Sequence, residues 1–211
     1  MKKSLLYLTA AISFSLLNVA MADPITECST RIRSNQYREA VPFCQEACNL
    51  NEVLGCNNLG VLYEEGKGVR QDYQQAKTYY EKACNLNEGA GCSGLGVLYA
   101  DGMGVRQDYQ QAKTYYEKAC NLNEGLGCFG LGVNYENGLG VRQDYQQAKT
   151  YYEKACNLNE GLGCLNLGVL YANGQGVRQN FQTAKEYFGR ACDLGVQKGC
   201  DYFRKLNEKG Y

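Results

Sequence analysis

The sequence contains no histidine and no tryptophan, and only two of its 211 residues are proline. Without histidine, the chain lacks the imidazole used by most catalytic zinc sites and by Ser-His and Cys-His nucleophile pairs. It also lacks Gly-x-Ser-x-Gly and the Walker-type phosphate loop. The formal net charge is zero, with 22 basic and 22 acidic residues, so there is no basic footprint for nucleic acid or anionic lipid.

Residues 1–22 have the features of a secretory signal peptide. The start Met1-Lys2-Lys3 is basic, residues 5–17 are mostly apolar, and Ala20-Met21-Ala22 has the small-x-small form of a signal peptidase site. A membrane-spanning helix is the alternative, but the apolar run is short and interrupted by polar residues. We expect cleavage after Ala22, a single repeat domain over residues 23–211, and a secreted or periplasmic location.

What the sequence does contain is one unit repeated every 36 residues. Segment 72–89, which begins Asp-Tyr-Gln-Gln-Ala-Lys, recurs without change at 108–125 and 144–161, and diverged copies begin at Tyr37 and Asn180. Such a fixed period is typical of a solenoid, in which each unit buries its apolar face only against its neighbours. We therefore predict an all-α protein, an α/α solenoid that forms a right-handed superhelix.

Each unit is predicted to contain two helices, which we call A and B. Apolar residues at three- and four-residue spacing place helix B over 73–86, with Asp72 as its N-cap. The same spacing places a shorter helix A over 56–65, which ends at Gly66. The chain gives five A/B pairs, followed by a single helix from about Lys198 to Lys209.

Two kinds of residue recur at the same position, or slot, of successive repeats, and they predict how the helices pack against one another. Helix A carries a glycine in four units, at Gly60, Gly96, Gly132 and Gly168. Glycine costs a helix about 1 kcal/mol relative to alanine, so we expect two backbones to approach closely there, with copying during duplication as the alternative. The regular tyrosines of helix B are expected to pack between helices of adjacent units, and a tyrosine-lined ligand pocket is the alternative.

All 12 cysteines follow residue 22, and an even number in an exported chain indicates disulfides. Five pairs share the spacing Cys-x7-Cys, which places one member near the end of helix B and the other at the start of the next helix A. Each such closure stabilises the fold by about 2.5 kcal/mol. Zinc is the alternative, but Cys-x2-4-Cys knuckles are absent, so we expect no metal and no cofactor. The predicted pairs are Cys48–Cys56, Cys84–Cys92, Cys120–Cys128, Cys156–Cys164 and Cys192–Cys200, with Cys28–Cys44 paired by exclusion.

The repeated motif Gly-Leu-Gly-Val-Leu-Tyr-x-x-Gly-x-Gly-Val-Arg-Gln-Asp-Tyr-x-x-Ala-x-x-Tyr-x-x-Lys-Ala-Cys resembles the Sel1-like repeat, a relative of the tetratricopeptide repeat, over nearly all of residues 37–203. With a Cys-x7-Cys pair in each unit and a signal peptide, the chain is similar more narrowly to the Helicobacter cysteine-rich protein family. The resemblance implies a scaffold that holds peptides or proteins on a concave face. From the cysteine-rich group it also implies penicillin binding with weak β-lactamase activity.

The residues themselves give no independent support for β-lactam hydrolysis. A serine β-lactamase needs Ser-x-x-Lys, Ser-Asp-Asn and Lys-Thr-Gly, and none of these motifs is present. Glu64 and Glu136 occupy equivalent places near the ends of A helices and could act as general bases if their pKa were raised. The alternative is that both are solvated, so enzymatic activity rests on resemblance alone and no catalytic residue is predicted.

Comparison of the three middle units indicates where a ligand would bind. Helix B is identical in all three, whereas the differences fall on helix A and the adjoining turns. Superhelices of this kind bind extended ligands on the concave surface, which helix A lines. Diversification for recognition therefore explains these slots, with drift after duplication as the alternative. The predicted ligand contacts are Ser93, Phe129, Asn134, Glu136, Asn137, Asn166 and Asn173.

Together these observations predict an exported binding scaffold whose groove holds a peptide, a protein or a cell-wall fragment. Binding and slow hydrolysis of β-lactams is the alternative function. We expect no nucleic-acid partner and no stable membrane span after signal cleavage. A monomer is favoured because both ends of the repeat array are atypical, as capping units are.

Overall fold

The computed structural model describes residues 23–211, and in this range it contains eleven α-helices and no strand. The helices are α1 (Pro24–Arg33), α2 (Tyr37–Asn49), α3 (Val53–Glu65), α4 (Tyr73–Asn85), α5 (Gly89–Asp101), α6 (Tyr109–Asn121), α7 (Gly125–Asn137), α8 (Tyr145–Asn157), α9 (Gly161–Asn173), α10 (Phe181–Asp193) and α11 (Gln197–Glu208). The pairs α1/α2 to α9/α10 are units 1 to 5, and α11 follows them. The predicted all-α solenoid is confirmed, whereas the predicted signal peptide lies outside the described residues.

Short polar and glycine signals fix the ends of these helices. The Asp72 carboxylate accepts hydrogen bonds from the backbone N–H groups of Gln74 and Gln75, as expected of an N-cap. Gly66 ends α3 in the left-handed conformation, with a φ of 68°, which glycine adopts without strain. The tight turn from α4 to α5 uses Asn87 with a φ of 64°. The predicted N-cap at Asp72 and the predicted end at Gly66 are therefore confirmed. The prediction of a shorter helix A from residue 56 is wrong, because α3 begins at Val53 and has 13 residues, as α4 does.

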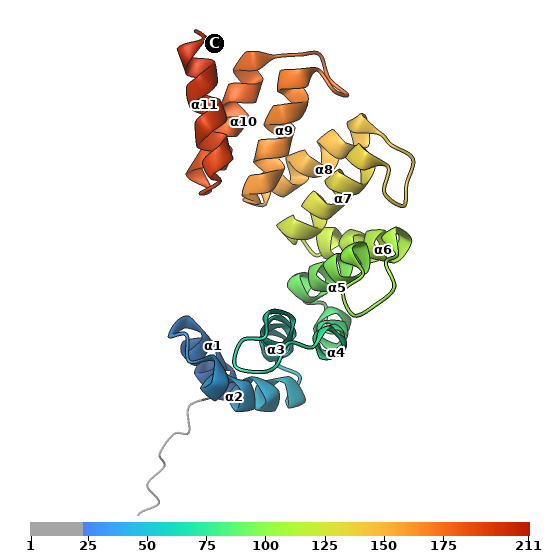
Figure 1. Ribbon diagram of the computed structural model, residues 1–211, viewed down its shortest axis with the longest axis vertical. Helices are drawn as coiled ribbons and strands as arrows, with labels where there is room; N and C mark the ends of the chain where they lie inside the picture. The colour runs from blue at the N-terminus through green and yellow to red at the C-terminus, as the bar shows by residue number, and fades with distance from the viewer. Residues whose placement is uncertain (1–22) are drawn as a thin grey trace, which may run out of the picture.

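The units form an arc, with α1 near one end and α11 at the other (Figure 1). Each A helix packs on its partner B helix and on the B helix of the preceding unit. Successive A helices also contact one another, whereas within residues 23–211 no two successive B helices pack to a comparable extent. The A helices therefore line the inner side of the arc and the B helices its outer side. No helix in this part of the chain is long and apolar enough to cross a membrane.

Six disulfides join the helices: the five pairs that the Cys-x7-Cys spacing predicts and the Cys28–Cys44 pair expected by exclusion. Cys28–Cys44 joins α1 to α2 within unit 1. The other five join the end of one B helix to the start of the following helix across eight positions of sequence, at Cys48–Cys56, Cys84–Cys92, Cys120–Cys128, Cys156–Cys164 and Cys192–Cys200. Every junction between consecutive units is therefore covalently crosslinked.

The recurring glycine of helix A contacts a tyrosine ring in units 2 to 4, at Gly60, Gly96 and Gly132, and the ring of Phe188 in unit 5, at Gly168. A Cβ added to Gly60 would lie 2.4 Å from the ring of Tyr80, and one added to Gly94 would lie 2.8 Å from the same ring. Tyr80 is thus held between α3 and α5, which confirms that these tyrosines pack between adjacent units. The prediction of close backbones at Gly60 is wrong, because a flat ring also needs the space of a missing side chain. Backbones do approach closely at Gly55, where a Cβ would lie 2.8 Å from the backbone nitrogen of Cys48.

Candidate ligand-binding surface

One stripe of each A helix faces the inside of the arc. On α7, Leu126, Val133 and Asn137 follow one another at seven- and four-residue spacing, so they share a face. These three side chains are partly or largely exposed, whereas Cys128 and Leu131 on another face are buried. Since the same slots recur in every unit, the stripes of α3, α5, α7 and α9 form a continuous inner surface.

Three of the predicted ligand contacts converge on Tyr152 of α8, which is completely buried. The ring of Phe129 lies 5.8 Å from that of Tyr152, measured between centroids. The Tyr152 hydroxyl donates a hydrogen bond to a carboxylate oxygen of Glu136, and the side chain of Asn166 lies close enough to influence the pKa of this tyrosine. Burial, followed by the bond to Glu136, raises the pKa of Tyr152 well above its usual value. Glu136 is therefore held by an internal donor, as Glu64 is by Tyr80.

Ser93 and Asn134 lie in the interior and are not part of the inner surface. Ser93 is fully buried and Asn134 is 2 % exposed, so neither can contact a ligand directly in this structure. Their prediction as ligand contacts is corrected on this ground. The Oγ atom of Ser93 and the Nδ2 atom of Asn134 have no hydrogen-bond partner among residues 23–211, which is costly for buried polar atoms.

The two remaining candidates, Asn137 and Asn173, are exposed at the ends of their A helices. Asn137 donates to the backbone carbonyl of Val133 at 3.0 Å, which leaves its amide oxygen facing solvent. Asn173 borders a cavity of about 300 Å³ between α9 and α11, together with Val169 and Tyr202. Lys205 of α11 and Lys209, which directly follows this helix, also line the cavity, so the C-terminal end of the inner surface combines apolar side chains with positive charge.

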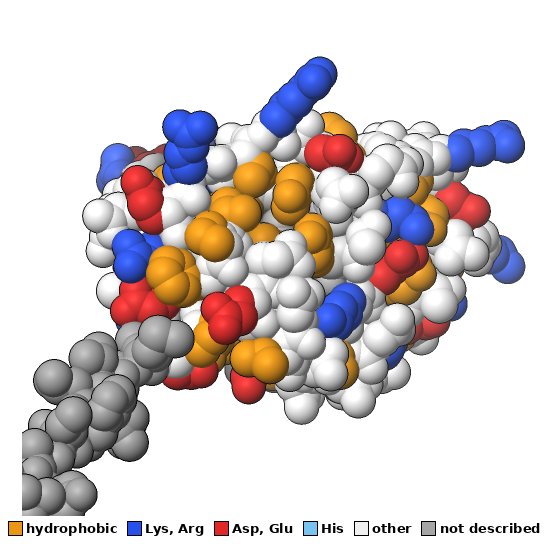
Figure 2. Space-filling view, turned by 90° about the horizontal axis from the view of Figure 1, so that it is seen from below, with side chains coloured by type: hydrophobic (Ala, Val, Ile, Leu, Met, Phe, Trp, Pro, Cys, Tyr) orange, Lys and Arg blue, Asp and Glu red, His pale blue; other side chains and the backbone are white. Residues whose placement is uncertain are grey.

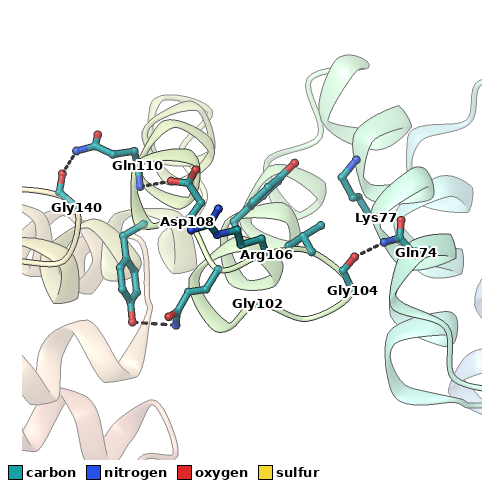
Figure 3. A pocket seen from close by; sticks show the side chains of 12 residues that line it. Gln74, Lys77, Gly102, Gly104, Arg106, Asp108, Gln110 and Gly140 are labelled. Carbon is teal, nitrogen blue, oxygen red and sulfur yellow. Dashed lines mark hydrogen bonds between the residues drawn. The ribbon is translucent and has the colours of Figure 1, made fainter.

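A larger and more open cavity, of about 1040 Å³, lies beside the loop between α5 and α6 (Figure 3). Lys77 and Arg106 lie on it, and the side chain of Gln74 donates to the backbone carbonyl of Gly104 across the unit boundary. A cavity with the equivalent lining recurs beside the loop between α9 and α10. The comparison of units missed these residues because Gln74, Lys77 and Arg106 are identical in the middle units.

The first unit lacks groups that bind a preceding unit elsewhere in the array. Tyr79 donates to Gln45 of the preceding unit at 2.6 Å, but its slot in unit 1 is Phe43, which has no hydroxyl. The residue of unit 1 that is equivalent to Lys82 is Glu46, which carries the opposite charge. Seen from this end, apolar side chains gather in the middle of the surface with charged ones around them (Figure 2). Unit 1 therefore differs from the others at the slots that contact a preceding unit.

The described residues offer few groups for covalent or metal chemistry. No group of three or more cysteine, aspartate or glutamate side chains within residues 23–211 could hold a metal ion. All cysteines in this range are in disulfides. Of the three serines, Ser93 is buried without a partner, and Ser29 and Ser34 lie on or after α1, away from the inner stripe of units 2 to 5. The arrangement is suited to binding by apolar contact and hydrogen bonds.

This architecture of repeated, stacked A/B pairs defines the class of protein: the chain belongs to the Sel1 repeat family. The family model matches four successive segments, residues 53–88, 89–124, 125–160 and 161–196. Each match runs from the start of one A helix to the turn after its B helix. The family and the fold implied by the resemblance are therefore confirmed.

Individual relatives show how closely other proteins match. A Sel1 repeat protein from Oxalobacter formigenes has a crystal structure with a TM-score of 0.78 and 26% identity, covering 86% of this chain and 74% of that chain. Helicobacter pylori cysteine rich protein B is 42% identical with a TM-score of 0.52, covering 62% of this chain and 94% of that one. The Helicobacter pylori protein named "Putative beta-lactamase HcpD" is 36% identical over 68 residues, which are 32% of this chain and only 22% of that protein.

Proposed function

We propose that this protein is an exported scaffold that binds an extended peptide segment of a partner protein along the inner surface of the arc. The observation that carries the proposal is the contrast between the two helices of a unit. Three B helices are identical, while the A helices that line the inner side differ at solvent-facing slots such as Asn137 and Asp101. Sel1 repeat proteins generally mediate protein–protein interactions, which supports this assignment. Six disulfides are consistent with a periplasmic or extracellular location.

The side chains of the inner surface favour a peptide with alternating apolar and polar groups. Leu126 and Leu162 are 37% and 41% exposed, at the same slot of successive A helices, and can cover apolar side chains of a ligand. Asn137 and Asn173, at the other end of the same stripes, can hydrogen-bond backbone amides. The same position holds Glu65 in unit 2 and Asp101 in unit 3, so two carboxylates and two amides follow one another along the inner surface and can hydrogen-bond the backbone of an extended chain.

The test is selection of binders from a displayed library of random peptides, with the oxidised protein of residues 23–211 as target. Selected peptides should bind about tenfold more weakly to an Asn137→Arg variant. The matched control is Gln147→Arg, which adds the same charge to an exposed slot of a B helix. Failure to enrich any peptide, or equal weakening by both substitutions, would show that the inner surface is not the binding site.

β-Lactam binding with slow hydrolysis is the second candidate, and the name of the HcpD relative is the observation that favours it. Its test is turnover of a chromogenic cephalosporin by oxidised protein from a lactamase-free host, compared with a Glu136→Ala variant prepared identically. Turnover that falls in the variant would support this function. Equal traces in both samples would identify a contaminating enzyme and leave the scaffold.

A further inference from the structure

The junction of α5, α6 and α7 contains a tyrosine hydroxyl that has no hydrogen-bond partner among the described residues. In unit 2 the Tyr80 hydroxyl donates to Glu64, and in unit 4 the Tyr152 hydroxyl donates to Glu136. The equivalent hydroxyl of Tyr116, in unit 3, makes no hydrogen bond within residues 23–211, although this residue is only 6% exposed. The hydroxyl is not one of the fully buried polar atoms that lack a partner, so it is open to an acceptor supplied by a ligand.

The missing acceptor has a clear origin in the sequence of α5. The slot that holds a glutamate in units 2 and 4 is Ala100 in unit 3. Unit 5 also has alanine in this slot, Ala172, but its tyrosine is replaced by Phe188, which has no hydroxyl to satisfy. Hydroxyl and carboxylate therefore occur together in units 2 and 4 and are both missing in unit 5. Only unit 3 of these four retains the donor and lacks the acceptor.

Two other unpartnered polar atoms belong to the same junction. Ser93 Oγ occupies the slot of Phe129, whose ring packs on Tyr152, so by equivalence Ser93 faces Tyr116. The second atom is Nδ2 of Asn134, which is equivalent in position to Leu98. Leu98 packs in one buried cluster with Tyr80, a residue of the unit before its own. By the same shift of 36 residues, Asn134 faces Tyr116 from α7. The surroundings of this hydroxyl are thus polar on both sides.

The charge near the junction selects the kind of acceptor. Asp101 follows Ala100 and lies close enough to Tyr116 to add to the effect of burial in raising the pKa of this tyrosine. The slot of Asp101 is Glu65 in unit 2, where Lys67 forms an ion pair with it at 2.7 Å. In unit 3 the slot of Lys67 is Met103, so no lysine neutralises Asp101. An anionic ligand group would be repelled, whereas an uncharged amide would not.

We propose that the junction of α5, α6 and α7 is a subsite for one backbone amide of an extended peptide, with the Tyr116 hydroxyl donating to the amide carbonyl oxygen. The carbonyl oxygen occupies the space that a glutamate carboxylate fills beside Tyr80 and Tyr152. The N–H of an adjacent peptide unit then has the Asp101 carboxylate as an acceptor. This inference deepens the proposed function, because it fixes the register of a peptide on the inner surface, and it rests on that function for its biological role.

The absence of an acceptor for the Tyr116 hydroxyl is tested by a substitution that introduces a carboxylate at position 100. An Ala100→Glu variant should form the bond seen in units 2 and 4 and raise the Tm by about 2 to 4 °C, a gain that an Ala100→Glu, Tyr116→Phe variant should lose. The matched control is Ala172→Glu, which faces Phe188 and should give no such rise. No rise in Ala100→Glu, or an equal rise in the control, would overturn the premise that the hydroxyl lacks an acceptor.

The ligand class is tested directly with a small uncharged probe, N-acetylglycine N-methylamide, followed by NMR of the tyrosine rings. Saturable shifts at the Tyr116 resonances, assigned with Tyr116→Phe and abolished in Ala100→Glu, are expected. The Tyr152 resonances, whose hydroxyl already has Glu136, should not respond. Absence of a response at Tyr116, or an equal response in Ala100→Glu, would overturn the subsite. Because the probe is not a selected peptide, this outcome is separate from failure of the peptide selection.

Discussion

The side-chain ammonium of Lys118 donates a hydrogen bond of 2.7 Å to the backbone carbonyl of Cys84, 34 residues earlier in the chain. Cys84 is at the C-terminal end of α4, where backbone carbonyls lack intrahelical partners and carry partial negative charge. The same contact recurs between Lys82 and Cys48, between Lys154 and Cys120, and between Arg190 and Cys156. The B helices α4, α6, α8 and α10 thus each place a cation on the end of the preceding B helix.

Replacing Lys118 with methionine should therefore loosen the contact between units 2 and 3. We expect the free energy of unfolding to fall by about 1 kcal/mol, and the Tm to fall by about 2 to 4 °C, because a charge-assisted bond to a helix end is lost. The matched control is Lys149→Met, which removes only the surface pair with Glu153. Thermal melts followed by circular dichroism measure both, and equal losses would contradict a special role for the Cys84 carbonyl.

The contact between Gly132 and the ring of Tyr152 predicts opposite effects for two glycine substitutions in helices. A Cβ on Gly132 would lie 2.4 Å from the ring, so Gly132→Ala should destabilise the protein by about 1 to 3 kcal/mol. Gly189 of α10 has its nearest neighbour, Phe203, at 3.4 Å, so Gly189→Ala should be neutral or stabilise by up to about 1 kcal/mol. Chemical denaturation of both variants is the measurement. A stable Gly132→Ala protein would show that the ring does not fill this slot.

Removal of single disulfides should have local effects, since each unit packs mainly on its neighbours. Without Cys192–Cys200, α11 loses its covalent link to α10, and hydrogen exchange should accelerate in α11 while units 1 to 3 keep their protection. Without Cys120–Cys128, protection should fall on both sides of the junction between α6 and α7. Each loss should cost about 2.5 kcal/mol. Uniform acceleration along the whole chain would contradict this view.

Alkaline pH should unfold the array through its buried tyrosines. Burial raises the pKa of Tyr80, Tyr116 and Tyr152 above their ordinary value, so the folded state favours the neutral phenol. Their contribution to stability is complete below roughly pH 10, the pKa of an unfolded tyrosine, and is lost as the pH rises beyond it. Tyrosinate absorbance and circular dichroism should be followed together. Ionisation of every tyrosine with helix content unchanged would contradict the burial.

Much of the fold could be predicted from the sequence because the decisive signals are local. The repeat period, the N-cap at Asp72, the C-terminal glycine at Gly66 and the Cys-x7-Cys spacing each depend on residues a few positions apart. The role of Gly60 could not be predicted in the same way. A glycine in the sequence indicates only that this position has no side chain. The three-dimensional structure shows that an aromatic ring of helix B fills the space beside it.

The candidate surface was harder to predict than the fold. Variation between units indicates helix A, which lines the inner side of the arc, but it does not separate positions that face solvent from those that face the next helix. Asn137 is exposed and Asn134 is buried, although only three positions separate them on one helix. The role of Lys118 was not predicted, because this residue is identical in every middle unit and a comparison of the units therefore does not single it out. Its partner is a backbone carbonyl, which no side-chain pattern reveals.

The disulfides that span the turns also determine what a protease could do to this protein. The exposed turn after α6, from Leu122 to Glu124, lies between Cys120 and Cys128, which are bonded to each other. Hydrolysis of a peptide bond in that turn leaves both new chain ends attached to the same molecule through sulfur. The equivalent turns after α4 and α8 are enclosed in the same way. A nicked molecule therefore keeps its full mass until it is reduced, and fragments separate only where a thiol is supplied.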